Sequence, residues 1–176
     1  MSRYNIDSPE KYSQLYKESV NEPEVFWSEL ASNNFLWEAK WSKVLDWDFR
    51  KAKVSWFKDA KLNITINCID RHVKNHPDKT AIIFEPNNPN EEYKLYSYSE
   101  LLAEVCKMAN VLKSLGVKRG DRVCIYLPMI PELAFSVLAC ARIGAIHSVV
   151  FAGFSSNALA TRIDDCKSSI IITTDG

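Results

Sequence analysis

The last third of the chain alternates between short apolar runs and longer stretches with helical spacing. Three runs are rich in β-branched residues and apolar on both faces, which is typical of buried strands: residues 122–127, 145–151 and 169–174. Two helical stretches separate these runs: residues 131–143 and 155–167. Pro131 stands at a predicted helix start and Gly144 at the end of that helix, where each residue is favoured. The pattern predicts a βαβαβ unit with a parallel sheet and right-handed crossovers.

One amphipathic helix is predicted directly before this unit. Ser97 and Glu100 have the capping-box spacing, in which each side chain pairs with a free amide of the other residue. Seven apolar side chains then recur with helical period: Leu101, Leu102, Val105, Met108, Ala109, Leu112 and Leu115. Gly116 follows at the position of a left-handed C-terminal cap.

The segment before that helix predicts a shorter helix and then a β-hairpin. Apolar residues after Leu62 have helical spacing until Pro77 ends the pattern. Two extended runs flank the turn sequence PNNPNE: residues 79–85 and 93–97. This arrangement is typical of two antiparallel strands.

The N-terminal arm, residues 1–61, differs in composition from the rest. All five tryptophans lie in this arm, from Trp27 to Trp56, and all five glycines lie beyond it. Three elements are predicted in the arm: helices over residues 9–20 and 22–32, and an extended segment over 54–57. Because large aromatic side chains bury much area, we expect the arm to lie against a larger body.

The elements together predict an α/β fold in two parts. The helical, aromatic arm is followed, over residues 62–176, by the β-hairpin and the βαβαβ parallel-sheet unit. The third predicted strand, 169–174, stands almost at the last residue, which leaves a sheet edge and part of a face without cover from later sequence. We therefore expect an N-terminal piece of a longer protein. The alternative is an edge strand covered by the arm.

Charge excludes two classes of partner. Lys and Arg number 22 and so do Asp and Glu, which argues against binding nucleic acid or a membrane surface by bulk charge. The N-terminus is polar and lacks the apolar region of a signal peptide. Residues 137–154 have the length of a membrane span, but Arg142, Gly144 and His147 interrupt them. We interpret this stretch as buried helix, turn and strand.

The cysteines indicate a reducing, cytoplasmic environment. Five are present, an odd number, and they are widely spaced without a CxxC pair: Cys68, Cys106, Cys124, Cys140 and Cys166. Structural zinc sites use closely spaced pairs, so no metal ligand is predicted. Each cysteine is expected to be a small buried apolar residue.

Few motifs in the chain point to chemistry. A GxGxxG fingerprint, a P-loop and a GxSxG nucleophile elbow are all missing from the sequence, and its three histidines are isolated. No catalytic residue is therefore predicted. Arg142 and Arg162 stand late in their helices, where cations interact favourably with the dipole, and Arg162 has the spacing of a surface pair with Asp165.

The turn after the second parallel strand is the best candidate for a binding site. It reads VVFAGFSS over residues 149–156, at the carboxyl end of a strand, where open α/β sheets bind ligands. Gly153 allows a ligand to approach the backbone, and Phe151 and Phe154 offer flat rings. Spacing alone favours the simpler alternative, in which both phenylalanines pack into the core and Gly153 only forms the turn.

Longer stretches resemble the acetyl-coenzyme A synthetases of the adenylate-forming superfamily. The resemblance covers LNITINCIDRHVKNHPDKTAIIFE, ACARIGAIHSVVFAGFS and RIDDCKSSIIITTDG, and ACARIGAIHSVVFAGFS is specific to the short-chain branch. The segments EPEVFWSELA and VSWFKDAKLN resemble the N-terminal extension of acetate– and propionate–CoA ligases. Nearly the whole chain is covered.

The resemblance implies a ligase that works in two steps. Acetate and ATP, with Mg²⁺, give an acetyl-adenylate and pyrophosphate, and the thiol of coenzyme A (CoA) then forms the thioester. In this family the turn after the second strand contributes to the pocket for the adenine end of CoA, which assigns Phe151, Ala152 and Gly153 to CoA binding. Ala152 stands where the family usually has glycine.

The family's remaining parts have no match in this sequence. The resemblance places the phosphate-binding loop, the acyl pocket and the catalytic lysine in the remainder of a parent chain, beyond Gly176. The fragment alone is therefore expected to be inactive. The alternatives are a propionate–CoA ligase of the same family and a non-catalytic truncated chain that acts as a binding module.

Overall fold

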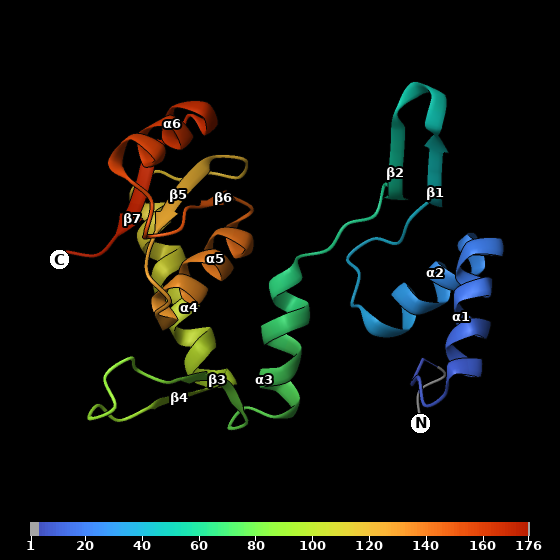
Figure 1. Cartoon of the computed structure of the whole chain (residues 1–176), viewed down its shortest axis with the longest axis horizontal. Helices are drawn as coiled ribbons and strands as arrows, with labels where there is room; N and C mark the ends of the chain where they lie inside the picture. The colour runs from blue at the N-terminus through green and yellow to red at the C-terminus, as the bar shows by residue number, and fades with distance from the viewer. Residues whose placement is uncertain (1–3, 176) are drawn as a thin grey trace. The chain divides into compact units, whose positions relative to one another are not determined.

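A computed structural model describes residues 4–175 of the chain. The chain divides into two compact units, Met1–Leu62 and Asn63–Gly176, each of which is considered by itself (Figure 1).

Unit 1 contains two helices and a β-hairpin. Its elements are α1 (Pro9–Asn21), α2 (Pro23–Asn34), β1 (Lys43–Asp48), the 3-10 turn η1 (Phe49–Lys51) and β2 (Lys53–Lys58). Both helices confirm the sequence-based prediction: the Ser8 side chain caps α1 and Pro23 opens α2. The sequence predicted β2 as an extended segment, whereas β1 was missed because it forms only by pairing with β2, for example Leu45 with Trp56.

The aromatic residues of unit 1 pack on one another. Trp27 meets Trp56 edge-on with ring centroids 5.9 Å apart, and Trp37 meets Trp41 in the same way at 5.0 Å. The Phe57 ring is tilted against Trp41 at 4.9 Å. Such pairs add to the burial of aromatic area. The expectation that this arm lies against a larger body stays a prediction.

Unit 2 begins with a helix that changes its winding. It contains the π-helical segment η2 (Ile66–Asp70) and continues as α3 (Arg71–Asn75), just before Pro77. The predicted helix is confirmed, but its π-winding was not foreseen, because the apolar spacing is similar in both forms. Ile69 is fully buried in the core of this unit.

The predicted hairpin and the helix after it are both present. Strand β3 (Thr80–Phe84) pairs antiparallel with β4 (Lys94–Ser97), and α4 (Tyr98–Ser114) follows at once. Ser97 and Glu100 form the predicted capping box. Gly116 has a φ of 87° after the end of α4, as the cap requires. Leu115 is exposed, so the buried stripe ends one turn earlier, at Leu112.

The last part of unit 2 is the predicted parallel sheet. Its elements are β5 (Arg122–Tyr126), α5 (Pro131–Ile143), β6 (Ile146–Val149), α6 (Ser156–Cys166) and β7 (Ile170–Thr173). The strand order is β6-β5-β7, and both pairings are parallel. The α/β fold with a three-stranded parallel sheet is thereby confirmed.

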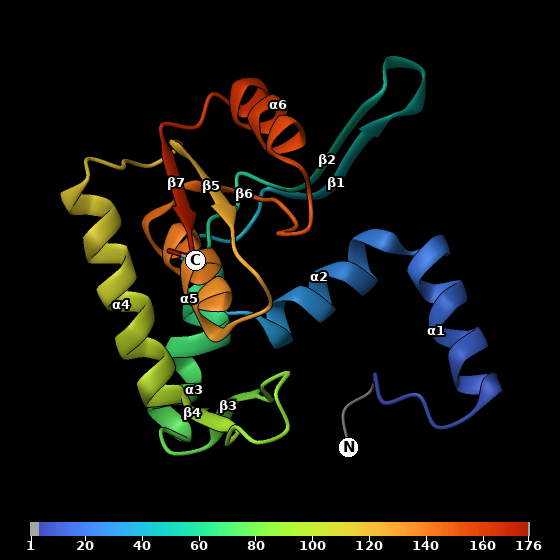
Figure 2. The same ribbon diagram turned by 60° about the vertical axis from the view of Figure 1, so that its left-hand side comes forward.

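The core of unit 2 lies between this sheet and helices α4 and α5. Fully buried residues from the three elements meet there: Val105, Leu112, Val123, Ile125, Ala139 and Cys140. Figures 1 and 2 show α6 on the opposite side of the sheet from α5. The two crossovers therefore lie on opposite faces of the sheet, as right-handed connections in opposite directions require.

Candidate functional site

The topology places a switch point between β5 and β6. The chain leaves the carboxyl end of β5 toward α5, whereas it leaves the neighbouring β6 toward α6, on the other side of the sheet. At such a point the loops diverge, and open α/β sheets bind their ligands there. Two features flank it: Tyr126 at the end of β5, and the turn of residues 150–155 after β6. We call this segment the β6–α6 turn.

The two phenylalanines of the β6–α6 turn are exposed. The exposed fraction is 65% for Phe151 and 41% for Phe154, and the rings meet edge-on with centroids 5.8 Å apart. The alternative that the sequence favoured, with both rings in the core, is wrong. The core position goes instead to Val150, which is buried and donates its amide to Ile125 O at 2.8 Å. The chain turns outward after Val150, so the next side chain faces solvent.

Gly153 leaves room for the ring of Phe151. A Cβ atom at Gly153 would lie 2.5 Å from Cε1 of Phe151, closer than carbon atoms approach. Ala152, next to this contact in the sequence, is half-buried. The lack of a side chain at Gly153 therefore lets the Phe151 ring adopt its present rotamer.

The start of α6 is closed by its own cap. Ser155 Oγ accepts the amide of Ala158 at 3.3 Å, and Ser155 O accepts the amide of Leu159 at 3.0 Å. The sequence predicted a helix from residue 155, and the structure places Ser155 at the N-cap of α6. The cap fixes the point at which the β6–α6 turn becomes helix.

Tyr126 ties the β6–α6 turn to the central strand, and sequence reasoning missed it. Its hydroxyl lies 2.7 Å from Ala152 O and 2.9 Å from Phe154 O, so one O–H donates between two turn carbonyls. The contact joins residues 26 and 28 positions apart. The only available signal was a tyrosine at the carboxyl end of a predicted strand.

Arg162 covers the second ring of the site. Its guanidinium carbon lies 4.5 Å from the centroid of Phe154, within the range of a cation–π contact, and Nη1 donates to Ala158 O at 2.8 Å. The sequence spacing suggested a pair with Asp165. Arg162 instead points back along α6 toward the turn, because side chains on a helix lean toward its N-terminus.

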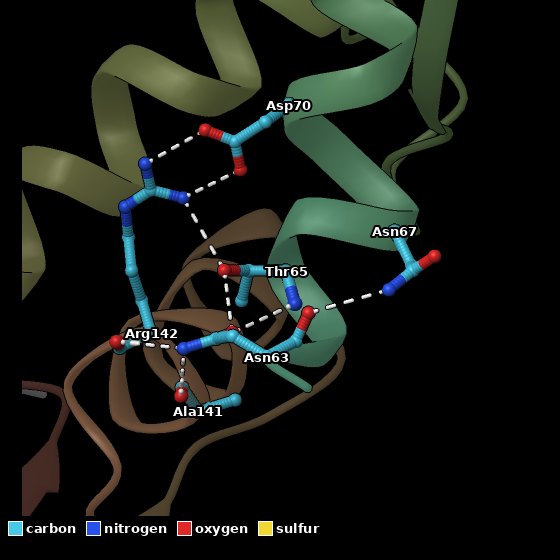
Figure 3. A network of polar contacts seen from close by, with 6 residues as sticks. All are labelled: Asn63, Thr65, Asn67, Asp70, Ala141 and Arg142. Atoms are coloured by element: carbon cyan, nitrogen blue, oxygen red, sulfur yellow. Dashed lines mark hydrogen bonds and ion pairs between the residues drawn. The ribbon is translucent and has the colours of Figure 1, made fainter. Parts of the chain in front are cut away.

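A polar network connects the C-terminal end of α5 with residues 63–70, which are distant in sequence (Figure 3). Arg142 donates through Nη1 and Nη2 to the two carboxylate oxygens of Asp70, at 2.8 and 2.9 Å. Nη1 is also 3.3 Å from Thr65 Oγ1. The sequence assigned Arg142 only a favourable place near the C-terminus of its helix. The structure gives it a bidentate ion pair with a residue 72 positions away.

Asn63 completes this network. Its amide nitrogen donates to Ala141 O at 3.3 Å and to Arg142 O at 3.0 Å, carbonyls at the C-terminal end of α5. Its amide oxygen accepts the backbone N–H and the hydroxyl of Thr65 at 3.0 and 2.8 Å. The helix therefore obtains part of its C-terminal capping from the start of unit 2.

The electrostatics of the network favour its charged form. The Arg142 guanidinium lowers the pKa of Asp70 below the usual aspartate value, although partial burial opposes this effect. The hydrogen bonds to Asp70 likewise raise the pKa of Arg142. Both groups are thus ionised at neutral pH, and each stabilises the charge of the other.

The cysteines are free thiols, as the sequence predicted. Cys124 and Cys140 are buried as expected, whereas the other three are only half-buried, so the expectation of burial is wrong for them. Burial raises the pKa of Cys140 to about 11 and also raises that of Cys68 and Cys124. These three thiols therefore stay protonated at neutral pH and are poor nucleophiles.

Residues 4–175 contain neither a cluster of metal-ligating side chains nor a membrane-spanning helix. Within that range no group of three or more His, Cys, Asp or Glu side chains is placed to hold a metal ion. None of the helices described there has both the length and the apolar character needed to cross a bilayer.

Two family models match the chain. The model described as "AMP-binding enzyme" matches residues 69–176, and the model described as "Acetyl-coenzyme A synthetase N-terminus" matches residues 12–68. The first match includes the whole parallel sheet and the β6–α6 turn. The second includes the aromatic cluster of unit 1.

Curated relatives match nearly the whole chain. It is 53% identical over 167 residues to acetyl-coenzyme A synthetase from Magnetococcus marinus, which covers 95% of the chain and 26% of the relative. It is 54% identical over 170 residues to the protein of that name from Leptospira biflexa, covering 96% and 26%. The corresponding values for Saccharophagus degradans are 51% over 166 residues, covering 94% and 26%.

The chain thus spans about a quarter of the length of these relatives. The resemblance noted in the sequence is confirmed for both parts of the chain. Residues 12–68 match the model of the acetyl-coenzyme A synthetase N-terminus, and the chain belongs to the AMP-binding enzyme family.

Proposed function

We propose that this chain is the N-terminal portion of an acetate–CoA ligase that makes acetyl-CoA from acetate, ATP and CoA through an acetyl-adenylate. The observation that carries the proposal is the identity of 51–54% to proteins named acetyl-coenzyme A synthetase across at least 94% of the chain. The two family matches support the same assignment for unit 1 and unit 2. We further propose that residues 1–61 are the N-terminal extension and that residues 62–176 are the first part of the AMP-binding domain.

Within this function, the β6–α6 turn binds the adenine end of CoA. Phe151 supplies an exposed ring for stacking, since aromatic faces stack on any base. Ala152 has a small side chain and Gly153 has none, so a flat ligand can reach the ring. The switch-point position supports this role, because the site lies where α/β sheets bind ligands.

ATP and Mg²⁺ belong to the same proposal, but we assign them no residue here. Among residues 4–175, no group of three or more His, Cys, Asp or Glu side chains is placed to hold a metal ion. A cytoplasmic location is part of the proposal, and the free thiols support it because disulfides are rare in reducing compartments.

A direct assay tests the proposed function. The full-length protein is expected to form acetyl-CoA and pyrophosphate when acetate, ATP, Mg²⁺ and CoA are all present, and to lose this activity when acetate is omitted. A higher kcat/KM for propionate would reassign it to the propionate–CoA ligases. Failure to release pyrophosphate with either acid would contradict the ligase proposal.

The 176-residue polypeptide alone is expected to release no pyrophosphate from ATP and acetate. The reason is that the family's phosphate-binding loop, acyl pocket and catalytic lysine are outside this sequence. Pyrophosphate release by the purified polypeptide, measured beside the full-length protein, checks this expectation. Acetate-dependent release above the level without enzyme would show it to be wrong.

Gly153→Ala in the full-length protein is expected to raise the KM for CoA by about 2- to 10-fold. The new methyl group forces the Phe151 ring away from its present rotamer, at a cost that corresponds to this range. Because Phe151 is exposed and can move aside, the melting temperature should hardly change. Ala158→Gly in α6 is a control for the change in backbone freedom between alanine and glycine. A KM for CoA in Gly153→Ala that equals the wild-type value would contradict the packing argument.

A further inference from the structure

We propose that Tyr126 is a positioning residue for CoA, which holds the β6–α6 turn in the conformation that presents Phe151. This inference rests on the proposed function, because it gives Tyr126 a part in the same site. The residue stands at the carboxyl end of β5, while the ring that it positions follows β6.

The backbone ladder between the two strands stops just before the turn. Its last bond runs from Val150 N to Ile125 O at 2.8 Å, one residue before Tyr126 and one residue before Phe151. The Tyr126 hydroxyl continues this connection from β5, because it lies 2.7 Å from Ala152 O and 2.9 Å from Phe154 O. A side chain thus takes over at the point where backbone pairing ends.

The two carbonyls fixed by Tyr126 enclose Gly153. The residue between them has no side chain to restrict its backbone, so without the hydroxyl the turn would have more accessible conformations. Within the turn itself, the backbone amide of Phe154 donates to Phe151 O at 3.0 Å. Together these bonds hold the backbone that carries Phe151 and Phe154, whose rings meet edge-on with centroids 5.8 Å apart.

The strand that carries Tyr126 is a rigid support. β5 is the central strand, paired with β6 on one side and with β7 on the other, where Tyr126 lies beside Thr173. Ile125, directly before it, is fully buried. Because Tyr126 holds the turn from this strand, the Phe151 ring is already positioned for stacking. Binding of a base then does not require the turn to become ordered first.

Tyr126→Phe in the full-length protein tests the inference, because only the hydroxyl is removed. The KM for CoA is expected to rise by about 2- to 10-fold, the range that corresponds to one lost hydrogen bond. Acetate-dependent exchange of pyrophosphate into ATP, which requires no CoA, should stay unchanged. Hydrogen exchange of the peptide that contains residues 150–156 should become faster.

Tyr96→Phe is the matched control. It removes the same atom from β4, where the ring packs edge-on against Phe135 with centroids 5.3 Å apart. This variant should keep the KM for CoA, the pyrophosphate exchange and the protection of residues 150–156.

Three outcomes would overturn the inference: an unchanged KM for CoA in Tyr126→Phe, unchanged protection of the turn, or an equal loss of the CoA and pyrophosphate-exchange activities. Phe151→Ala, measured alongside, separates the two proposals. If Phe151→Ala raises the KM for CoA and Tyr126→Phe does not, only the positioning role fails. If neither variant affects CoA, the proposed CoA site fails as well.

Discussion

Phe151→Ala in the full-length protein is expected to raise the KM for CoA by roughly 5- to 150-fold. Stacking of a base on an aromatic side chain contributes about 1–3 kcal/mol, and this range converts to the stated factor. Phe151 is 65% exposed, so its truncation removes a surface for the ligand and leaves no cavity in the core. Steady-state kinetics with CoA varied at saturating ATP and acetate measure the effect.

The KM for ATP should be nearly the same in Phe151→Ala as in the wild type. Phe49→Ala is the matched control, because Phe49 is also an exposed phenylalanine in a turn but belongs to the hairpin of unit 1. It should leave both constants unchanged. A KM for CoA that stays at the wild-type value in Phe151→Ala would refute the assignment of this turn to CoA.

Arg142→Ala is expected to destabilise the start of unit 2 by about 2 kcal/mol. Breaking a fully buried ion pair costs about 3–5 kcal/mol and a surface pair about 0–1 kcal/mol. This pair lies between these limits, since the exposed fractions of the Arg142 and Asp70 side chains are 26% and 33%. Hydrogen exchange of residues 63–75 in the full-length protein should therefore become about 30-fold faster at neutral pH.

Lys107→Ala provides the control for this measurement. Lys107 forms an exposed ion pair with Glu104 on α4. Loss of this pair should change the hydrogen exchange of residues 63–75 by less than about 3-fold. Asp70→Ala should reproduce the effect of Arg142→Ala, and the double variant should add little to either, because the two residues form one pair. Additive effects would mean that the bidentate pair is not the source of the stability.

The contribution of the pair should also depend on pH in a defined direction. The pKa of Asp70 is lowered in the folded state, so the folded state binds its proton less tightly than the unfolded state. The stabilisation is then complete above the unfolded pKa of about 4 and is lost only as the pH falls through the lower folded pKa. The difference between wild type and Arg142→Ala should be constant from about pH 5 to pH 8 and decrease in stronger acid.

Local sequence signals were sufficient to locate most secondary structure. The prediction for residues 131–143 coincides with α5, because Pro131 and Gly144 act through their own backbone angles. The capping box of Ser97 and Glu100 fixed the start of α4 for the same reason. The strand β1 was missed, since its alternating side chains gain their preference only from pairing with β2.

The candidate site was located correctly along the sequence but not in its exposure. The pattern identified the turn after the second parallel strand, yet it favoured burial of Phe151 and Phe154, which the structure shows to be exposed. An apolar residue that follows a buried strand gives the same sequence pattern whether its side chain is buried or exposed. The direction in which the chain turns after Val150 determines whether these rings are exposed. That direction depends on where α6 packs.

The sequence by itself determined the element order apart from β1, the parallel α/β class and the family, because these depend on hydrophobic period, caps and contiguous motifs. Only the tertiary structure decided the strand order, the pairing of Arg142 with Asp70 and the bond from Tyr126 to the β6–α6 turn. These contacts join residues 26 to 72 positions apart, and their energy appears only once the sheet and helices have brought the partners together.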